Sequence, residues 1–432
     1  MLTKLKRQKK LVSPQNFLLI NTFDKVVYSS FLLFAFIIPL SKAAISFFLF
    51  WFFFLFLYKR DYKGSFKILK SKPIFLTMAL FLSYMYLSLL WSEDIKEGLN
   101  QARLYAYWIL VLPSAAVLIK KEWLKSILNS FLLGMFVSEI LAYGIFFDLW
   151  SFNGRTPNYP TPFMTHIHYS IFLAFTSIIL LHKVINKNFT LYAKLPYLIF
   201  FLISTTNLMF STGRAGQLAF FCSLIILIFL KYKISLKSIT LGLVSVILIF
   251  SMAYNSLDLF KQRADAAVSD IKNITNQNYQ NSFGLRVVYW IITYEVLKEK
   301  PLFGDGIGDF IDAATKIVKK KEFGLDKNGI EFYKTQHYHN QYLMVAVQGG
   351  LTGLSLMFLM FLHFFKLNIK NREFKEISIL GFVVILVGFV AEPLWMLQFP
   401  NTLFLFIAFI SIAASKDNSV IILKTKKRIT DE

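Results

Sequence analysis

Long apolar runs alternate with short polar and basic clusters along most of this chain. A hydrocarbon core of about 30 Å is crossed by about 20 apolar helical residues, or by about 17 at the short end. By this measure the pattern predicts twelve membrane-spanning helices, near residues 26–40, 43–58, 73–91, 102–119, 123–149, 166–182, 195–210, 215–230, 236–257, 339–363, 376–395 and 400–415. The predicted fold is therefore all-α and polytopic.

One boundary affects every later assignment. The stretch Pro39-Leu-Ser-Lys42 interrupts an otherwise continuous apolar run from 26 to 58. Because a lysine at mid-membrane costs roughly 3 kcal/mol, we divide this run into two helices. A single helix here would invert the orientation of every span that follows.

Basic residues are unevenly distributed between alternate connections. With the N-terminus in the cytoplasm, the cytoplasmic connections are rich in lysine and arginine, and the opposite short connections hold few cations. The basic connections lie near residues 59–72, 120–125, 183–194, 231–237 and 366–375. The positive-inside rule thus predicts twelve spans with both termini cytoplasmic.

The same pattern divides the chain into four parts. Residues 1–257 hold the first nine spans, 339–415 hold the last three, and 416–432 form a cytoplasmic tail. Between the two sets of spans, residues 258–338 are long, polar and helical in periodicity, and we expect them outside. Their lysines are compatible with this placement because long segments translocate largely regardless of charge.

Composition excludes two broad classes. The 432 residues are 56% hydrophobic with a mean hydropathy of +0.54, which is too apolar for a soluble domain. The net charge of +22 lies in short clusters between spans, so it indicates topology and no nucleic-acid partner. The one cysteine, Cys222, lies in an apolar run, which excludes an internal disulfide and a cysteine-based metal site.

Arg214 lies in Ser211-Thr-Gly-Arg-Ala-Gly216, at an expected external junction of two spans. Its glycines permit a tight turn and close approach to a ligand, and the helix that follows offers N-terminal amides to an anion. A second interpretation stays open, in which Arg214 reaches lipid headgroups as other arginines at helix ends do.

Arg286 begins an amphipathic stretch within the external segment. Its predicted apolar face consists of Val287, Tyr289, Trp290, Ile291, Tyr294 and Leu297. Such a helix lies against a membrane surface. Arg286 then either binds any lipid phosphate or directs its planar guanidinium at a specific diphosphate.

Three glycines alternate in Pro301-Leu-Phe-Gly-Asp-Gly-Ile-Gly308, which contains Asp305. A nucleotide-binding loop is disfavoured because no strand precedes the glycines. We interpret the segment as a turn, with a second option that its amides face a sugar or phosphate.

His339 is predicted to open the tenth span, directly before Asn340. An imidazole that titrates near neutral pH can take a proton from an attacking hydroxyl, and the alternative is a His–Asn pair that caps the helix. We expect no metal site, since His337 and His339 are not spaced on one helical face and no carboxylate or cysteine cluster joins them. His166 and His168 are expected either to line the same cavity or to be interfacial polar residues.

Together these segments resemble the O-antigen ligase superfamily of bacterial glycan transferases. Ser211–Gly216 looks like the family's arginine turn, and Arg286 followed by Tyr289-Trp290 and Pro301–Gly306 is similar to its periplasmic arginine helix and glycine element. His339-Asn340-Gln-Tyr-Leu343, with glycines beyond it, looks like the family's His-Asn-x-Tyr-Leu motif. Gly213 stands where serine is common before the arginine.

The resemblance implies a function and a location. It implies transfer of a glycan from undecaprenyl diphosphate to a lipid A–core sugar hydroxyl at the periplasmic face of the inner membrane, without metal or cofactor. Arg214 and Arg286 would stabilise the diphosphate, and His339 would be the general base. The side chains expected to line the cavity are His337, His168, His166, Asn340, Tyr289 and Asp305.

Three alternatives stay open at this point. An O-antigen polymerase and a protein O-oligosaccharyltransferase of the same superfamily would share the donor and the arginines but not the acceptor. A glycolipid transporter would perform no covalent chemistry. It is disfavoured because the candidate residues gather at one surface and no internal repeat is apparent.

Overall fold

The structure is a computed structural model that describes residues 21–186, 190–275, 279–321 and 323–416. Every regular element within these ranges is helical. The helices are α2 (Thr22–Ile37), α3 (Lys42–Tyr58), α4 (Tyr62–Lys70), α5 (Pro73–Leu87), η2 (Ser88–Trp91), α6 (Ile95–Leu118), η3 (Lys121–Trp123), α7 (Leu124–Phe146), α8 (His166–Val184), α9 (Leu191–Phe210), α10 (Arg214–Tyr232), α11 (Leu236–Ser256), α12 (Asp258–Thr275), α13 (Ser282–Glu299), α14 (Phe310–Lys320), α15 (Lys327–Thr335), α16 (Gln341–Phe365), α17 (Arg372–Gly388), η4 (Leu394–Met396) and α18 (Gln398–Ala414). The predicted all-α class is confirmed.

Seven stretches of the described chain are long and apolar enough to cross a membrane. They are Pro73–Trp91, Lys121–Phe146, His166–Val184, Leu191–Phe210, Arg214–Tyr232, Leu236–Ser256 and Gln341–Phe365. The bent pair α3 and α4, with an angle of 116°, makes an eighth if it is counted as one span, and α18 is apolar but shorter. These helices support a polytopic membrane protein, while twelve spans remain a prediction.

The predicted segments each overlap an α-helix, but some of their ends differ. The predicted break between the first two helices is present, because α2 ends at Ile37 and Ser41 caps α3. The prediction that His339 opens the tenth span is wrong. Asn340 is the N-cap of α16, so His339 lies outside the helix. Helix α17 ends at Gly388, so the last part of the predicted span 376–395 consists of a loop and the start of η4.

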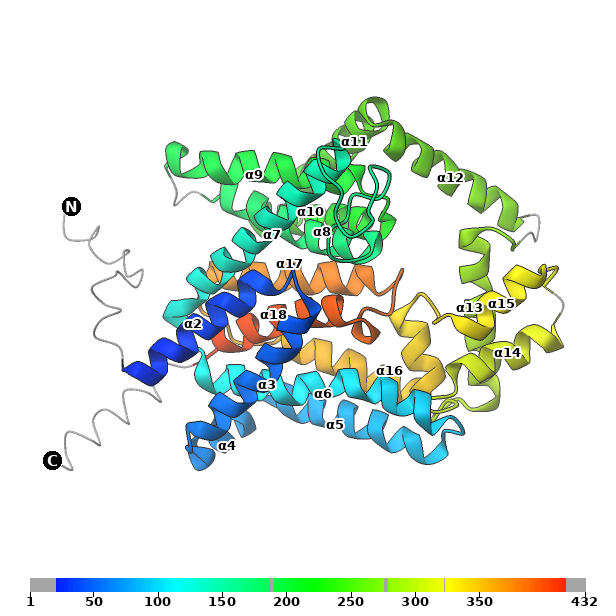
Figure 1. Ribbon diagram of the computed structural model, residues 1–432, viewed down its shortest axis with the longest axis horizontal. Helices are drawn as coiled ribbons and strands as arrows, with labels where there is room; N and C mark the ends of the chain where they lie inside the picture. The colour runs from blue at the N-terminus through cyan, green and yellow to red at the C-terminus, as the bar shows by residue number, and fades with distance from the viewer. Residues whose placement is uncertain (1–20, 187–189, 276–278, 322, 417–432) are drawn as a thin grey trace.

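Figure 1 shows α12, α13, α14 and α15 gathered at one end of the helical bundle. Helices α13, α14 and α15 share a small core with the first turns of α16, to which Tyr289, Phe310, Tyr338 and Met344 contribute. The segment before α16 is therefore packed onto the bundle. We call this end of the bundle the site end.

Helix α13 divides its apolar residues between two sides. Val288, Tyr289 and Ile292 are buried in the small core with α14, α15 and α16, whereas Trp290 and Tyr294 of the predicted apolar face are exposed. That the exposed side lies against a membrane surface stays a prediction.

A buried ionic cluster joins three helices at the opposite end of the bundle. Glu376 of α17 accepts hydrogen bonds from His182 of α8 at 2.7 Å, from Lys231 of α10 at 2.5 Å and from Arg372 at 2.7 Å. Because the carboxylate has a partner on each side, the charge is compensated despite its burial. The cluster holds α8, α10 and α17 in register, and their other ends therefore lie together at the site end.

The glycine-rich turn after α13 forms backbone hydrogen bonds with α16 at the point where that helix is interrupted. Gly350 has φ 62° and ψ −160°, which interrupts the helix. The amides of Asp305 and Gly306 donate to the carbonyls of Val347 and Gln348 at 2.8 and 3.1 Å, and Leu351 donates back to Pro301 at 2.9 Å. The alternative that these two amides face a sugar or phosphate is wrong, since both are used to pair the turn with α16.

Candidate active site

Glu392 bridges the two neighbouring histidines. Its Oε2 lies 3.0 Å from Nδ1 of His339, and its Oε1 lies 3.3 Å from Nε2 of His337. The carboxylate is only 5% exposed, and the side chain of His339 is 14% exposed. The ring of His339 also stacks on Phe332, with centroids 5.5 Å apart and an interplanar angle of 11°.

The hydrogen bonds assign the tautomers of both rings. The backbone N–H of His339 donates to Nδ1 of His337 at 3.4 Å, so that nitrogen is an acceptor and the ring proton of a neutral His337 is on Nε2, which lies 3.3 Å from Oε1 of Glu392. His339 uses Nδ1–H to donate to the same carboxylate. Its Nε2 is therefore the ring atom that can take a proton from a substrate.

His339 adopts a backbone conformation that is unusual for its residue type. Its φ is 46°, in the left-handed region, which costs a non-glycine residue about 1–3 kcal/mol in a constrained site. The neighbouring contacts maintain it, because Asn340 caps α16 and also donates to Val390 O at 3.1 Å, and Gln341 N donates to Phe389 O at 2.8 Å. These bonds tie the start of α16 to the loop that carries Glu392.

The expectation that no carboxylate joins His337 and His339 is wrong. Their ring nitrogens and a Glu392 oxygen all lie within 4.8 Å of one another, an arrangement that can hold a metal ion. The nearby charge of Arg286, which acts on His337, opposes a bound cation. We therefore interpret the three residues as a hydrogen-bonded group, and the expectation of a metal-independent enzyme stays a prediction.

Burial and charge act in opposite directions on the pKa values of this group. Burial acts to raise the pKa of Glu392, but the hydrogen bond from His339 and the charges of the two histidines outweigh it, so the pKa lies below its usual range. Burial lowers the pKa of His337, against the opposing charge of Glu392. An ionised Glu392 beside a neutral His337 follows at neutral pH.

Arg214 is the first residue of α10 and is 41% exposed. Its Nη1 lies 3.5 Å from Oδ2 of Asp270 on α12. The glycines around it serve helix packing, because a Cβ at Gly213 or Gly216 would lie 2.3 or 2.1 Å from atoms of Ser170 on α8. The turn therefore approaches α8 closely, which sets the direction in which α10 leaves the site end.

Arg286, on α13, faces the same region. Burial lowers the pKa of its guanidinium, while the charges of Glu392, Arg214 and Asp270 also act on it. An arginine keeps its charge at neutral pH under such a shift, since its ordinary pKa is above about 12. The three sequence-predicted residues thus lie in one region, because the charge of Arg286 interacts with Arg214 and with Glu392, the partner of His339.

The two histidines at the start of α8 belong to the same electrostatic environment. The charge of Glu392 acts on both His166 and His168, and those of Arg155 and Arg263 act on His166. His168 is buried and His166 is half-buried. Both therefore lie near the site end, and that they line a cavity stays a prediction.

Two other expected lining residues have structural partners. Tyr289 is buried in the small core, where its hydroxyl donates to Gln336 O at 3.2 Å. Asp305 pairs with Nζ of Lys300 at 2.8 Å in the glycine-rich turn. Asn340 has a cap role, as the alternative interpretation expected for a His–Asn pair, although His339 itself takes no part in the cap.

Glu392 is the functional candidate that the sequence reasoning passed over. A signal was present, because it is the only charged residue between Glu376 and Lys416. An isolated ionisable residue within apolar sequence is a functional candidate in a membrane protein.

The arrangement combines two chemical capacities. Two guanidiniums placed near each other suit a ligand with several negative charges, such as a diphosphate. An imidazole oriented by a buried carboxylate suits proton removal from a hydroxyl. Their proximity favours a reaction in which a nucleophilic hydroxyl and an anionic leaving group are handled together.

Comparison with known proteins agrees with this reading. A family model described as O-antigen ligase matches residues 199–358, which include Arg214, Arg286 and His339. The match supports membership of the O-antigen ligase superfamily. An uncharacterized protein of Haemophilus influenzae (strain Rd) is 28% identical over 337 residues, which cover 74% of this chain and 79% of the relative.

Proposed function

We propose that this member of the O-antigen ligase superfamily transfers a glycan from undecaprenyl diphosphate to a sugar hydroxyl of lipid A–core. The observation that carries the proposal is the convergence of Arg214, Arg286 and the His339–Glu392 pair on one region. Superfamily membership supports a lipid-linked glycan as the substrate class. The identities of the donor lipid and the acceptor are part of the proposal.

In the proposed reaction, Nε2 of His339 takes the proton of the acceptor hydroxyl as its oxygen attacks the anomeric carbon of the donor. The bond between that carbon and the diphosphate oxygen breaks, and polyprenyl diphosphate leaves with the electron pair. Direct attack inverts the anomeric centre. General base catalysis of this kind contributes about 10²–10⁴-fold to the rate.

Arg214 and Arg286 are assigned to the leaving group. Negative charge grows on the diphosphate as the glycosidic bond breaks, and fixed guanidiniums near it lower the energy of the transition state. Glu392 is a positioning residue: it keeps the proton of His339 on Nδ1 and favours the imidazolium that forms. No step requires a metal ion.

The proposed topology has twelve spans, both termini in the cytoplasm and the site end in the periplasm of a bacterial inner membrane. Cysteine labelling tests it, because Cys222 is the one natural cysteine and its replacement gives a clean background. Asn158→Cys, in the loop between α7 and α8, should react with an impermeant reagent in intact cells. Lys366→Cys, after α16, should react only after lysis, and the reverse pattern would refute the orientation.

The function is tested by electrophoresis of lipopolysaccharide from a deletion strain. The deletion should leave uncapped lipid A–core while lipid-linked glycan accumulates, and the wild-type gene should restore capping. Unchanged capped lipopolysaccharide would refute the ligase. Single-unit capping would instead identify a polymerase, and loss of protein glycosylation a protein O-oligosaccharyltransferase.

A purified-protein assay separates enzyme from transporter and tests metal dependence. Transfer of glycan to the acceptor by protein in lipid nanodiscs, with the same rate after treatment with a chelator, is the expected result. Absence of transfer to any acceptor favours a transporter. Loss of transfer on chelation, with recovery on adding a divalent cation, would mean that His337, His339 and Glu392 hold an ion.

A further inference from the structure

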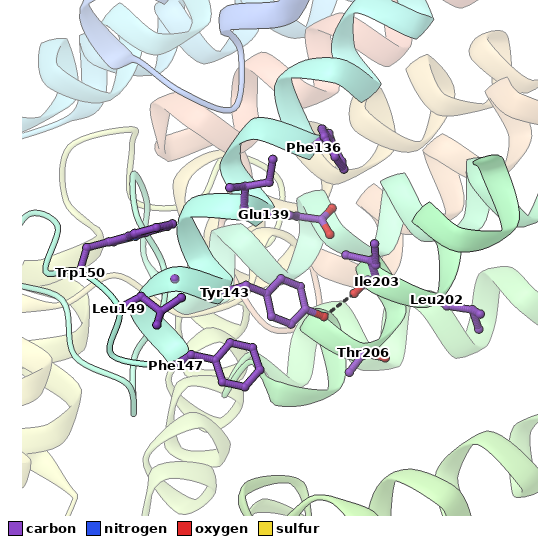
Figure 2. Close-up of a pocket in the computed structure, with 11 residues that line it drawn as sticks. Phe136, Glu139, Tyr143, Phe147, Leu149, Trp150, Leu202, Ile203 and Thr206 are labelled. Carbon is purple, nitrogen blue, oxygen red and sulfur yellow. Dashed lines mark hydrogen bonds between the residues drawn. The ribbon is translucent and has the colours of Figure 1, made fainter.

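An apolar pocket of about 580 Å³ lies between α7 and α9. Figure 2 shows Phe136 and Tyr143 of α7 and Phe147 just after it, with Leu202 and Ile203 of α9 opposite. The hydroxyl of Tyr143 is engaged, because it donates to Ile203 O at 2.7 Å. The pocket therefore offers a ligand mainly hydrocarbon and aromatic surface.

The wall of the pocket is built by a specific packing contact. Trp150 lies flat against α7 at Gly144, where a Cβ would be 1.8 Å from the indole ring. The indole Nε1 donates to Leu141 O at 3.2 Å, which fixes the ring in place. Tryptophan is typical of the membrane–water interface, so Trp150 places one edge of the pocket near the membrane surface.

A fully buried carboxyl lies beneath the pocket. Ser204 Oγ donates to Oε1 of Glu139 at 2.7 Å, and Oε2 has no hydrogen-bond partner among the described residues. An ionised carboxylate with an unpartnered oxygen would be very costly in such surroundings. An uncharged Glu139 carboxyl and apolar lining side chains suit a lipid chain and disfavour a charged headgroup.

The pocket lies at the end of α9 that leads to the arginines. Thr206 lines it, α9 ends at Phe210, and Arg214 begins α10. At 1.5 Å per helical residue and at most about 3.6 Å per extended residue, the Cα atoms of Thr206 and Arg214 are within about 20 Å of each other. Both α7 and α9 are candidate spans, and the lining side chains of Phe136, Ile140 and Leu202 are exposed, so the pocket opens on a surface that would face lipid in a membrane.

We propose that this pocket holds part of the prenyl chain of the lipid diphosphate donor. The inference rests on the proposed function, because a diphosphate bound at Arg214 and Arg286 must direct its covalently attached chain into the membrane close by. The covalent link raises the effective concentration of the chain at an adjacent pocket. Rigid aromatic walls suit the planar, branched units of a prenyl chain.

Photocrosslinking tests the occupant directly and needs no catalytic activity. The probe is a long-chain polyprenyl diphosphate with a diazirine in its chain, bound to full-length protein in nanodiscs. Adducts on the lining residues of α7 and α9, displaced by unlabelled polyprenyl diphosphate, are expected. Adducts elsewhere would overturn the proposal, as would equal labelling by a diazirine phospholipid that polyprenyl diphosphate does not displace.

A pocket-filling variant tests the consequence for activity. Leu202→Trp places an indole in the pocket at a position that is already exposed, and Leu248→Trp on α11 is a matched control at an equally exposed position outside it. We expect Leu202→Trp to raise KM for a long-chain donor about tenfold with kcat unchanged, as for lost ground-state binding. The control and a short-chain donor should show no change.

The two hypotheses fail in different ways. If wild-type protein transfers no glycan, the proposed function fails, and the crosslinking result still decides what the pocket binds. If transfer is normal and Leu202→Trp leaves KM for the long-chain donor unchanged, the pocket proposal alone is refuted.

Discussion

Glu392 accepts a hydrogen bond from Nδ1 of His339 at 3.0 Å across 53 residues of sequence. In Glu392→Gln the carbonyl oxygen can still accept that bond, but the negative charge that stabilises an imidazolium is lost. We expect kcat for transfer to fall about 10- to 100-fold, less than the full general-base contribution of about 10²–10⁴ because His339 is still present, with KM unchanged. Glu392→Asp should retain more activity, and folded yield should stay at the wild-type level.

This prediction separates positioning from folding. A variant whose yield and thermal unfolding midpoint match wild type but whose kcat is low supports the role of Glu392. Equal kcat in Glu392→Gln and wild type would remove Glu392 from the mechanism.

Arg286 and Arg214 are expected to act on the leaving group. Arg286→Ala and Arg214→Ala should each lower kcat/KM about 10²–10³-fold, the effect of removing one stabilising group from a developing anion. Arg286→Lys should recover only part of this loss, since an ammonium lacks the planar fork of a guanidinium. Rates are measured with purified protein that has passed a size-exclusion check.

A matched control for the arginines comes from the same small segment. Lys298→Ala, on the last turn of α13, removes a cation that lies over the ring of Tyr294, away from the site. Its rate should equal that of wild type. A comparable loss in Lys298→Ala would indicate a general effect of charge on the segment.

Gly350→Ala tests the break in α16. The residue has φ 62°, and a Cβ there would lie 2.4 Å from the carbonyl carbon of Leu302. The strained conformation alone costs an alanine about 1–3 kcal/mol, so we expect a lower unfolding midpoint and reduced yield. Gly353→Ala, three residues later on the same helix, meets neighbours only at 3.4 Å or more and should be well tolerated.

Similar midpoints for these two variants would show that the turn after α13 and the helix are less tightly joined than their hydrogen bonds indicate. Fluorescence-detected thermal unfolding in detergent gives both midpoints under one condition.

His337 gives the folded protein a pH-dependent stability. Burial lowers its pKa in the folded state, so below the ordinary histidine value of about 6.5 the unfolded chain binds a proton that the folded chain resists. Stability should therefore fall as pH decreases through this window. Glu392, whose pKa is lowered, stays ionised there, and its contribution is lost only at still lower pH.

The measurement compares unfolding midpoints at pH 7.5 and 5.5. His337→Gln should show a smaller decrease than wild type. The control is His363→Gln, near the far end of α16, where the ring of His363 contacts Thr77 of α5. This control should show the same decrease as wild type. An undiminished decrease in His337→Gln would assign the effect to other groups. The transfer rate of His337→Gln should be only mildly reduced.

The pattern of apolar runs predicted the helices well, because a run of about 20 apolar residues can be recognised as a helix from that segment alone. The same reasoning selected Arg214, Arg286 and His339, which the fold brings to one region. It failed where partners are distant in sequence. Spacing along one helix suggested that no carboxylate joins His337 and His339, yet Glu392 reaches both from the loop after α17.

Local rules also misplaced the start of one helix and did not show which side of another faces the core. The start of α16 was assigned to His339, whereas the side chain of Asn340 caps the helix and leaves His339 in a left-handed conformation. The buried face of α13 depends on α14, α15 and α16, so its own periodicity was insufficient. In both cases the outcome was decided by contacts between segments and by a capping side chain.

The pairing of the Pro301–Gly308 turn with the interrupted helix at Gly350 has a consequence for protein engineering. Backbone hydrogen bonds run in both directions across this seam, and Tyr84 of α5 donates to carbonyls on either side of it. A chimera that imports the α12–α15 segment of a homologue while keeping its own α16 would join two surfaces that were never selected together. Grafts that carry residues 258–365 as one cassette preserve the seam.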